Sequence, residues 1–157
     1  LYYFSQRNLN CMRLSGIVHS IGNMDYIPPA RYPEDLAHIP AEQMAELIRK
    51  LAADCGYEII ILDVGNYGHQ AAPILSVCQI VYMPIKEDGI SSAKIREFEA
   101  YAERTGNSGM LDKVKKLKLP YHRGFGRREN YIEQLLWSEL GDYVRKLMRG
   151  SREEMEC

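Results

Sequence analysis

The sequence predicts an α/β fold in three layers, with helices on both faces of a mostly parallel sheet. The first observation is a continuous apolar run at residues 59–62, bounded by Gly56 and Asp63, which is typical of a strand buried on both faces. The second is that predicted strands and helices alternate, as in parallel sheets joined by right-handed crossovers. The third is size and composition: 157 residues, 46% hydrophobic and 26% charged, suit one domain with a real core.

The first half of the chain predicts two helical segments and two strands. Apolar residues at helical spacing precede a turn at Gly22-Asn23: Leu14, Ile17, Val18 and Ile21. A short strand at 24–27 stops at Pro28-Pro29, because proline cannot continue a ladder. Pro40 is a good first helical residue, and Gly56 is predicted to end this helix as a left-handed cap. The apolar stripe of this helix is Met44, Leu47, Ile48 and Leu51. The central strand at 57–64 follows.

The second half continues the alternation. A helix is predicted at 69–77, a strand at 79–85, and then a helix capped by Ser91 or Ser92 that runs to Arg104. A break at 105–109 separates this helix from an edge strand at 114–120. The chain then continues with helices at 129–137 and 138–148 and a frayed charged tail at 151–157. Between the last strand and helices lies a basic loop with Arg123, Arg127 and Arg128, which we interpret as a solvated loop rather than a nucleic-acid site.

Charge and cysteine usage exclude several classes of function. The net charge of −1 gives no general attraction to nucleic acid or to an anionic membrane, and no apolar run reaches transmembrane length. The four cysteines (Cys11, Cys55, Cys78 and Cys157) are scattered, with no C-x-x-C pair and no histidine at ligand spacing. We therefore expect incidental thiols in a reducing cytoplasm and no zinc site.

Several segments together resemble MinD/ParA-type ATPases, closest to their CpaE-like branch. The similar segments are Asp25-Tyr26-Ile27-Pro28-Pro29, Pro33-Glu34-Asp35-Leu36, Gly56 through Asp63, Ile80 through Pro84, Ser91-Ser92-Ala93 and Leu117 through Pro120. The resemblance implies a Rossmann-like P-loop NTPase core in which Asp63 is the Walker B aspartate, holding Mg²⁺ through a water molecule or positioning the attacking water. It implies ATP and Mg²⁺ as cofactors, and self-association of the intact parent around ATP.

The family's phosphate-binding loop has no counterpart in this sequence. That loop, K-G-G-x-G-K-T, holds the β- and γ-phosphates with backbone N–H groups and a lysine. The only glycine-rich match, Gly124-Phe125-Gly126-Arg127-Arg128, comes late and lacks the Lys-Ser/Thr pair. We therefore interpret residues 1–150 as the C-terminal portion of a larger ATPase domain and 151–157 as a disordered tail. Such a chain alone should hydrolyse ATP negligibly.

The resemblance also implies the remaining site residues. Gly65 and Gly68 would let a switch-like loop meet a γ-phosphate, and the loop at Pro120 and Tyr121 would lie near the adenine. A structural interpretation stays open for each residue. Asp63 can be a sheet-edge cap for the next segment, and the glycines can be ordinary turn residues.

Two other functions also remain open. One is a nucleotide-free α/β scaffold for protein contacts. The other is a receiver-like phospho-acceptor domain, which also places an aspartate at the end of a buried strand. This second alternative fits less well because Asp25 has no acidic neighbour and Met83-Pro84 stands where a hydroxyl residue is needed. The partner protein and the cargo are not indicated by any motif.

Overall fold

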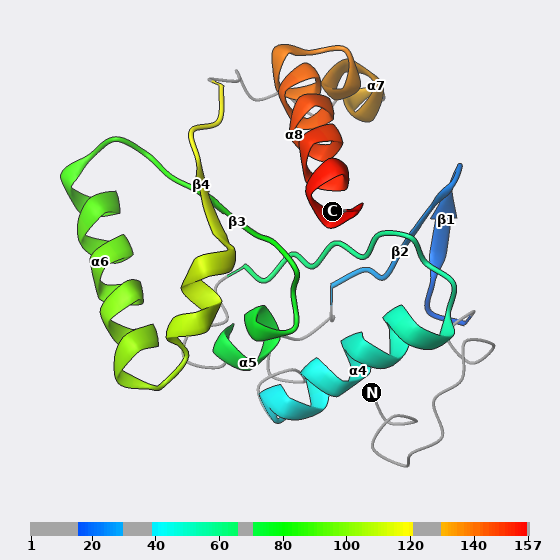
Figure 1. Cartoon of the computed structure of the whole chain (residues 1–157). Helices are drawn as coiled ribbons and strands as arrows, with labels where there is room; N and C mark the ends of the chain where they lie inside the picture. The colour runs from blue at the N-terminus through cyan, green and yellow to red at the C-terminus, as the bar shows by residue number, and fades with distance from the viewer. Residues whose placement is uncertain (1–15, 30–38, 66–70, 121–129, 157) are drawn as a thin grey trace. The chain divides into compact units, whose positions relative to one another are not determined.

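The computed structural model describes residues 16–29, 39–65, 71–120 and 130–156, with side chains up to Ser151 (Figure 1). The chain divides into two compact units. The first combines Leu1–Val81 with Glu99–Lys113, and the second combines Tyr82–Phe98 with Val114–Cys157. Helices and strands are mixed, as predicted. Among the described residues, however, the strands form one antiparallel pair and one parallel pair rather than a clear three-layer sheet.

In the first unit, a hairpin replaces the helical pattern expected before Gly22. Strand β1 (His19–Ile21) pairs antiparallel with β2 (Met24–Tyr26), and Ser20 lies opposite Asp25. Gly22 has a φ of 60°, the positive value that the primed turns of two-residue hairpins need at their first position. The prediction of helix up to Ile21 was therefore wrong for 19–21, and the strand predicted at 24–27 is present but antiparallel.

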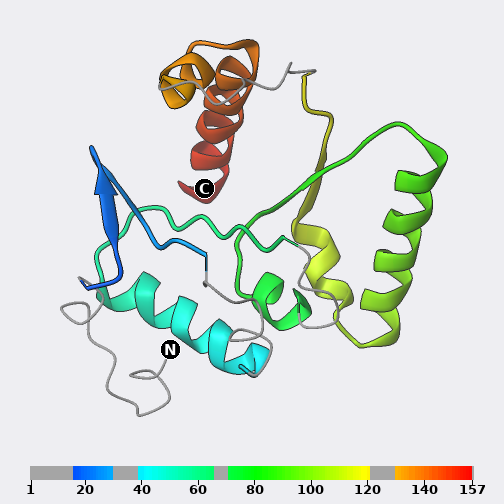
Figure 2. The same ribbon diagram turned by 180° about the vertical axis from the view of Figure 1, so that it is seen from behind.

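The helix predicted from Pro40 to Gly56 is confirmed as α4 (Ala41–Asp54), which packs against α5 (Ala71–Ser76; Figure 1 and Figure 2). Gly56 has a φ of 69°, so it provides the expected left-handed end. The predicted apolar stripe is half-buried, and Ala41 and Ala45 of the same helix are buried. The short α5 buries Ala72, Ile74 and Leu75. These two helices supply most of the buried side chains of the unit.

The 3₁₀ helix η2 (Ser108–Lys113) closes this unit against α5, in the region where the sequence indicated only a break. Its Met110 is buried. The Lys113 Nζ atom donates a hydrogen bond of 2.7 Å to the carbonyl oxygen of Ser76, the last residue of α5. A cation at this position satisfies a terminal carbonyl and complements the negative end of the helix dipole.

The segment at 57–64 belongs to neither sheet among the described residues, so the prediction of a central strand buried on both faces was wrong. Exposure alternates along it: Ile59, Ile61 and Asp63 are exposed, whereas Ile60, Leu62 and Val64 are half-buried. This period of two is the pattern of a backbone with one buried side. Ile61 is 79% exposed, although its residue type favours burial.

The parallel pair is formed by β3 (Val81–Pro84) and β4 (Val114–Leu117), which belong to the second unit apart from Val81 at the start of β3. Both strands lie within the predicted ranges, and the backbone N–H of Ile85 extends the pairing with a 2.8 Å bond to the carbonyl oxygen of Leu117. The connection between them includes α6 (Gly89–Arg104). A parallel pair needs such a crossover because its strands cannot be joined by a tight turn.

Helix α6 begins three residues before Ser92 and is capped by Asp88, not by Ser91 or Ser92 as predicted. The Asp88 Oδ1 atom accepts a 2.6 Å hydrogen bond from the backbone N–H of Ser91, the geometry of an N-cap. At the other end, Gly106 has a φ of 74° and the N–H of Asn107 bonds to the carbonyl oxygen of Ala102 at 2.8 Å. Together with the bond from Gly106 to Glu103, this forms a Schellman motif. The predicted break at 105–109 therefore has a physical cause.

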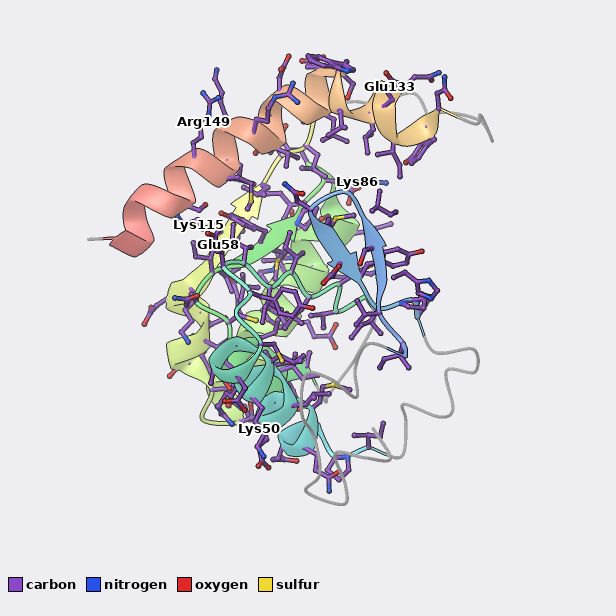
Figure 3. All side chains as sticks on the ribbon, turned by 90° about the vertical axis from the view of Figure 1, so that its right-hand side faces the viewer. Lys50, Glu58, Lys86, Lys115, Glu133 and Arg149 are labelled. Carbon is purple, nitrogen blue, oxygen red and sulfur yellow. The ribbon has the colours of Figure 1, made fainter. Side chains whose placement is uncertain are left out.

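At the C-terminus, α7 (Tyr131–Leu136) packs on α8 (Glu139–Glu156), with exposed side chains such as Glu133 and Arg149 (Figure 3). Ser138 caps α8 by accepting a 3.2 Å bond from the N–H of Gly141. Arg145 joins the two helices: its Nη1 atom bonds to the carbonyl oxygen of Leu136 at 2.6 Å, and its guanidinium lies 5.9 Å from the centre of the Trp137 ring.

Helix α8 continues past Met148, where the sequence analysis ends it, through most of the segment interpreted as a tail. Ser151 is buried and its hydroxyl bonds to the carbonyl oxygen of Leu147 at 2.8 Å and to the Tyr82 hydroxyl on β3. This tertiary contact lies at the point where the composition becomes strongly charged, so a charged sequence did not prevent the helix from continuing.

Candidate functional site

Asp63 and Gly65 are the two predicted site residues that the structure places in one segment. Both are exposed, and they follow the half-buried side chain of Leu62. Gly65 has a φ of 53°, a backbone conformation that favours glycine because a side chain would be strained there. The side chain of Asp63 is accessible to solvent two residues before Gly65. The residues that it could cap, 66–70, lie outside the described part of the chain.

A single exposed carboxylate can contribute one ligand to a magnesium ion that is also bound by phosphate oxygens. Mg²⁺ usually keeps several waters and is held by one or two carboxylates together with substrate phosphates. Among the described residues, no group of three His, Cys, Asp or Glu side chains is arranged to hold a metal ion. Asp63 could serve Mg²⁺ as one ligand, directly or through water, together with phosphate oxygens.

The other predicted site residues lie either outside the described residues or in the other unit. Gly68 and Tyr121 lie outside the described residues, as does the basic loop with Arg123, Arg127 and Arg128. Pro120 is half-buried and belongs to the second unit, whereas Asp63 belongs to the first. The nucleotide site implied by the resemblance therefore stays a prediction.

A cluster that the sequence analysis missed joins the hairpin to the segment after α4. The carboxylate of Asp25 accepts hydrogen bonds from the Ser20 hydroxyl at 2.5 Å and from the Tyr57 hydroxyl at 3.0 Å. On the same hairpin, the rings of His19 and Tyr26 stack with their centres 5.3 Å apart. Asp25 thus connects the two strands of the hairpin to each other and to the segment after α4.

These hydrogen bonds set the protonation behaviour of the cluster. The bond from Ser20, and then the bond from Tyr57, lower the pKa of Asp25 because both stabilise its ionised form. The same bond to Asp25 raises the pKa of the Tyr57 hydroxyl. A carboxylate with a lowered pKa is a weak base, so Asp25 is poorly suited to accept a proton from Ser20. The described contacts of the cluster fit a structural connection.

The sequence did contain a signal for this cluster. Gly22-Asn23 lies between two short segments, and a Gly-Asn pair at such a position is typical of a two-residue hairpin. Once that hairpin is assumed, its register places Ser20 opposite Asp25. The helical spacing of the apolar residues before Gly22 led to the other interpretation.

The carboxyl ends of β3 and β4 are the positions at which parallel sheets bind ligands. Here the loop after β3 forms an ion pair between Glu87 and Lys118, which follows β4, and both side chains are exposed. Asp88 directs its carboxylate to the amino end of α6. An acidic side chain of the protein therefore already occupies the position where an anionic ligand would gain from the helix dipole.

The two described cysteines differ in bonding state, because one is a free thiol and the other is disulfide-bonded. Cys78 is a free, half-buried thiol whose Sγ atom lies 3.5 Å from the carbonyl oxygen of Ile74. Burial raises the pKa of this thiol, and nearby Lys113 partly opposes that effect. A thiol with a raised pKa is a poor nucleophile. Cys55 is disulfide-bonded, so the expectation of four free thiols was wrong at this residue.

Comparison with known proteins identified no relative: no family model matches the chain, and no significant match was found among curated proteins or solved structures. Within the part of the chain that the structure describes, no helix combines the length and the apolar character needed to cross a membrane.

Proposed function

We propose that this chain is part of an ATP-binding switch protein of the MinD/ParA kind, in which Asp63 is the carboxylate on the metal side of the nucleotide. The observation that supports the proposal is the exposed position of Asp63 after an apolar run, followed by a left-handed Gly65. This arrangement leaves a carboxylate and a glycine backbone available to a magnesium–phosphate group.

The proposal includes inactivity of the chain alone. The sequence contains no K-G-G-x-G-K-T loop, so backbone N–H groups and a lysine that hold the β- and γ-phosphates must come from residues outside it. We expect the intact protein to self-associate around ATP and to position or assemble a protein partner. Asp63 would then need phosphate oxygens, supplied by the bound nucleotide, to complete the magnesium shell.

A cytoplasmic location is part of the same proposal, and it rests on the function rather than on the cysteines. The free Cys78 thiol is compatible with a reducing compartment. The disulfide at Cys55 counts against it, because structural disulfides are rare in the cytoplasm of mesophiles.

The proposal is tested by paramagnetic relaxation with Mn²⁺ and ATP. In ¹⁵N NMR spectra of the intact protein, which by this proposal supplies the phosphate-binding loop, small additions of Mn²⁺ with ATP should broaden the amide signals of Val64 and Gly65 first. The Asp63→Asn variant should lose this selective broadening. Asp54→Asn is a matched control, because Asp54 is an exposed carboxylate at the end of α4 in the same unit. The proposal fails if Asp63→Asn is broadened in the same way as the unaltered chain.

A nucleotide-free scaffold for protein contacts is the second candidate function. It is favoured by the apolar side chains that the segment after α4 exposes, with Ile59 at 50% and Ile61 at 79%. Exposed apolar patches are typical of interaction sites, whereas single exposed residues need no explanation.

Sedimentation velocity tests this second candidate. If the segment binds a second copy of the chain, Ile61→Lys should abolish concentration-dependent association. Ile90→Lys should leave it unchanged, because Ile90 is similarly exposed but lies at the start of α6 in the other unit. A chain that remains monomeric at all concentrations would exclude a self-associating scaffold.

A further inference from the structure

We draw no further inference here: the strongest candidate, the exposed apolar side of the segment at residues 59–63, which forms no backbone hydrogen bond to another described residue, carries nothing because nothing in the structure shows what covers it.

Discussion

At Asp25, hydrogen bonds from two hydroxyl groups lower the pKa of one carboxyl group. Ser20 and Tyr57 donate to its two oxygen atoms, and both bonds exist only while the hairpin and the segment after α4 hold their positions. The lowered pKa of Asp25 favours folding above its ordinary value of 3.8, and this contribution is lost as the pH falls through the lower folded value. The raised pKa of Tyr57 favours folding below 10.0, and this contribution is lost as the pH rises through the folded value.

The first prediction concerns the pKa of Asp25, measured from its side-chain carboxyl ¹³C signal. It should lie below 3.8 in the unaltered chain. Ser20→Ala should raise it more than Tyr57→Phe does, because the Ser20 bond is the larger cause of the shift. Equal values in all three proteins would mean that the hydrogen bonds do not form in solution.

The second prediction concerns Gly141, where α8 passes close to the end of α7. A Cβ atom there would lie 2.4 Å from the carbonyl oxygen of Leu136, and backbone must move to accommodate it. Gly141→Ala should therefore lower the free energy of unfolding by about 1–3 kcal/mol, the usual cost of overpacking. Urea denaturation followed by circular dichroism measures the change.

Gly150→Ala is the matched control for Gly141→Ala. Gly150 also lies within α8, but a Cβ atom there would have no neighbour within 4 Å. Because alanine favours a helix over glycine by about 0.5–1 kcal/mol, this variant should be slightly more stable. If Gly141→Ala were stabilised equally, the close approach of the two helices would be refuted.

At the scale of elements, the sequence predicts best where the signal is local. The apolar stripe after Pro40, the glycine at 56 and the break at 105–109 predict α4 and the end of α6 correctly, because caps and periodicity act within a few residues. The pairing of strands depends on distant segments. The apolar run at 59–62 indicates a strand but not which neighbour it pairs with, and the described structure gives it none.

The third prediction distinguishes the observed segment at 57–64 from a strand buried on both faces. Ile61→Lys should change the free energy of unfolding by no more than about 0.5 kcal/mol, as expected for an exposed position. Ile74→Lys, at a residue only 3% exposed in α5, should cost about 3–5 kcal/mol because it buries an unpaired charge. Unfolding of the Ile61→Lys chain would instead support the central strand that the sequence predicts.

At the scale of the whole molecule, the buried apolar residues all belong to the first unit among the described residues. They are Ala41, Ala45, Ala72, Ile74, Leu75, Val81, Ala102 and Met110. In the second unit, Ser151 is the buried residue of the described part. Local stability follows the burial of apolar side chains, so the two units should differ in how readily they open.

The fourth prediction follows from that difference and is measured by amide hydrogen exchange. Amides in the middle of α4 should exchange more slowly than those in the middle of α8, although α8 is the longer helix. Both helices are free of proline, so intrinsic sequence effects provide a simple reference for each. Slower exchange in α8 would show that burial in the described structure does not determine local stability.

The candidate site could be predicted only in part. The sequence shows an acid after an apolar run and a glycine two residues later, and the structure places both at exposed positions, with Gly65 in the left-handed region. The hydrogen bond between Asp25 and Tyr57 could not be predicted from the sequence, because the two residues are 32 positions apart and Asp25 lies on a hairpin that the sequence analysis did not predict. The N-cap at Asp88 was missed because two nearby serines are equally good capping residues.

The division of the chain at Val81, Phe98 and Lys113 limits how the protein can be taken apart. Any single cut leaves one unit without part of its own sequence, since residues 82–98 belong with the C-terminal segment and 99–113 with the N-terminal one. Neither unit is therefore a continuous segment of the sequence that could be exchanged between proteins by itself. The two units are encoded by interleaved stretches of one chain.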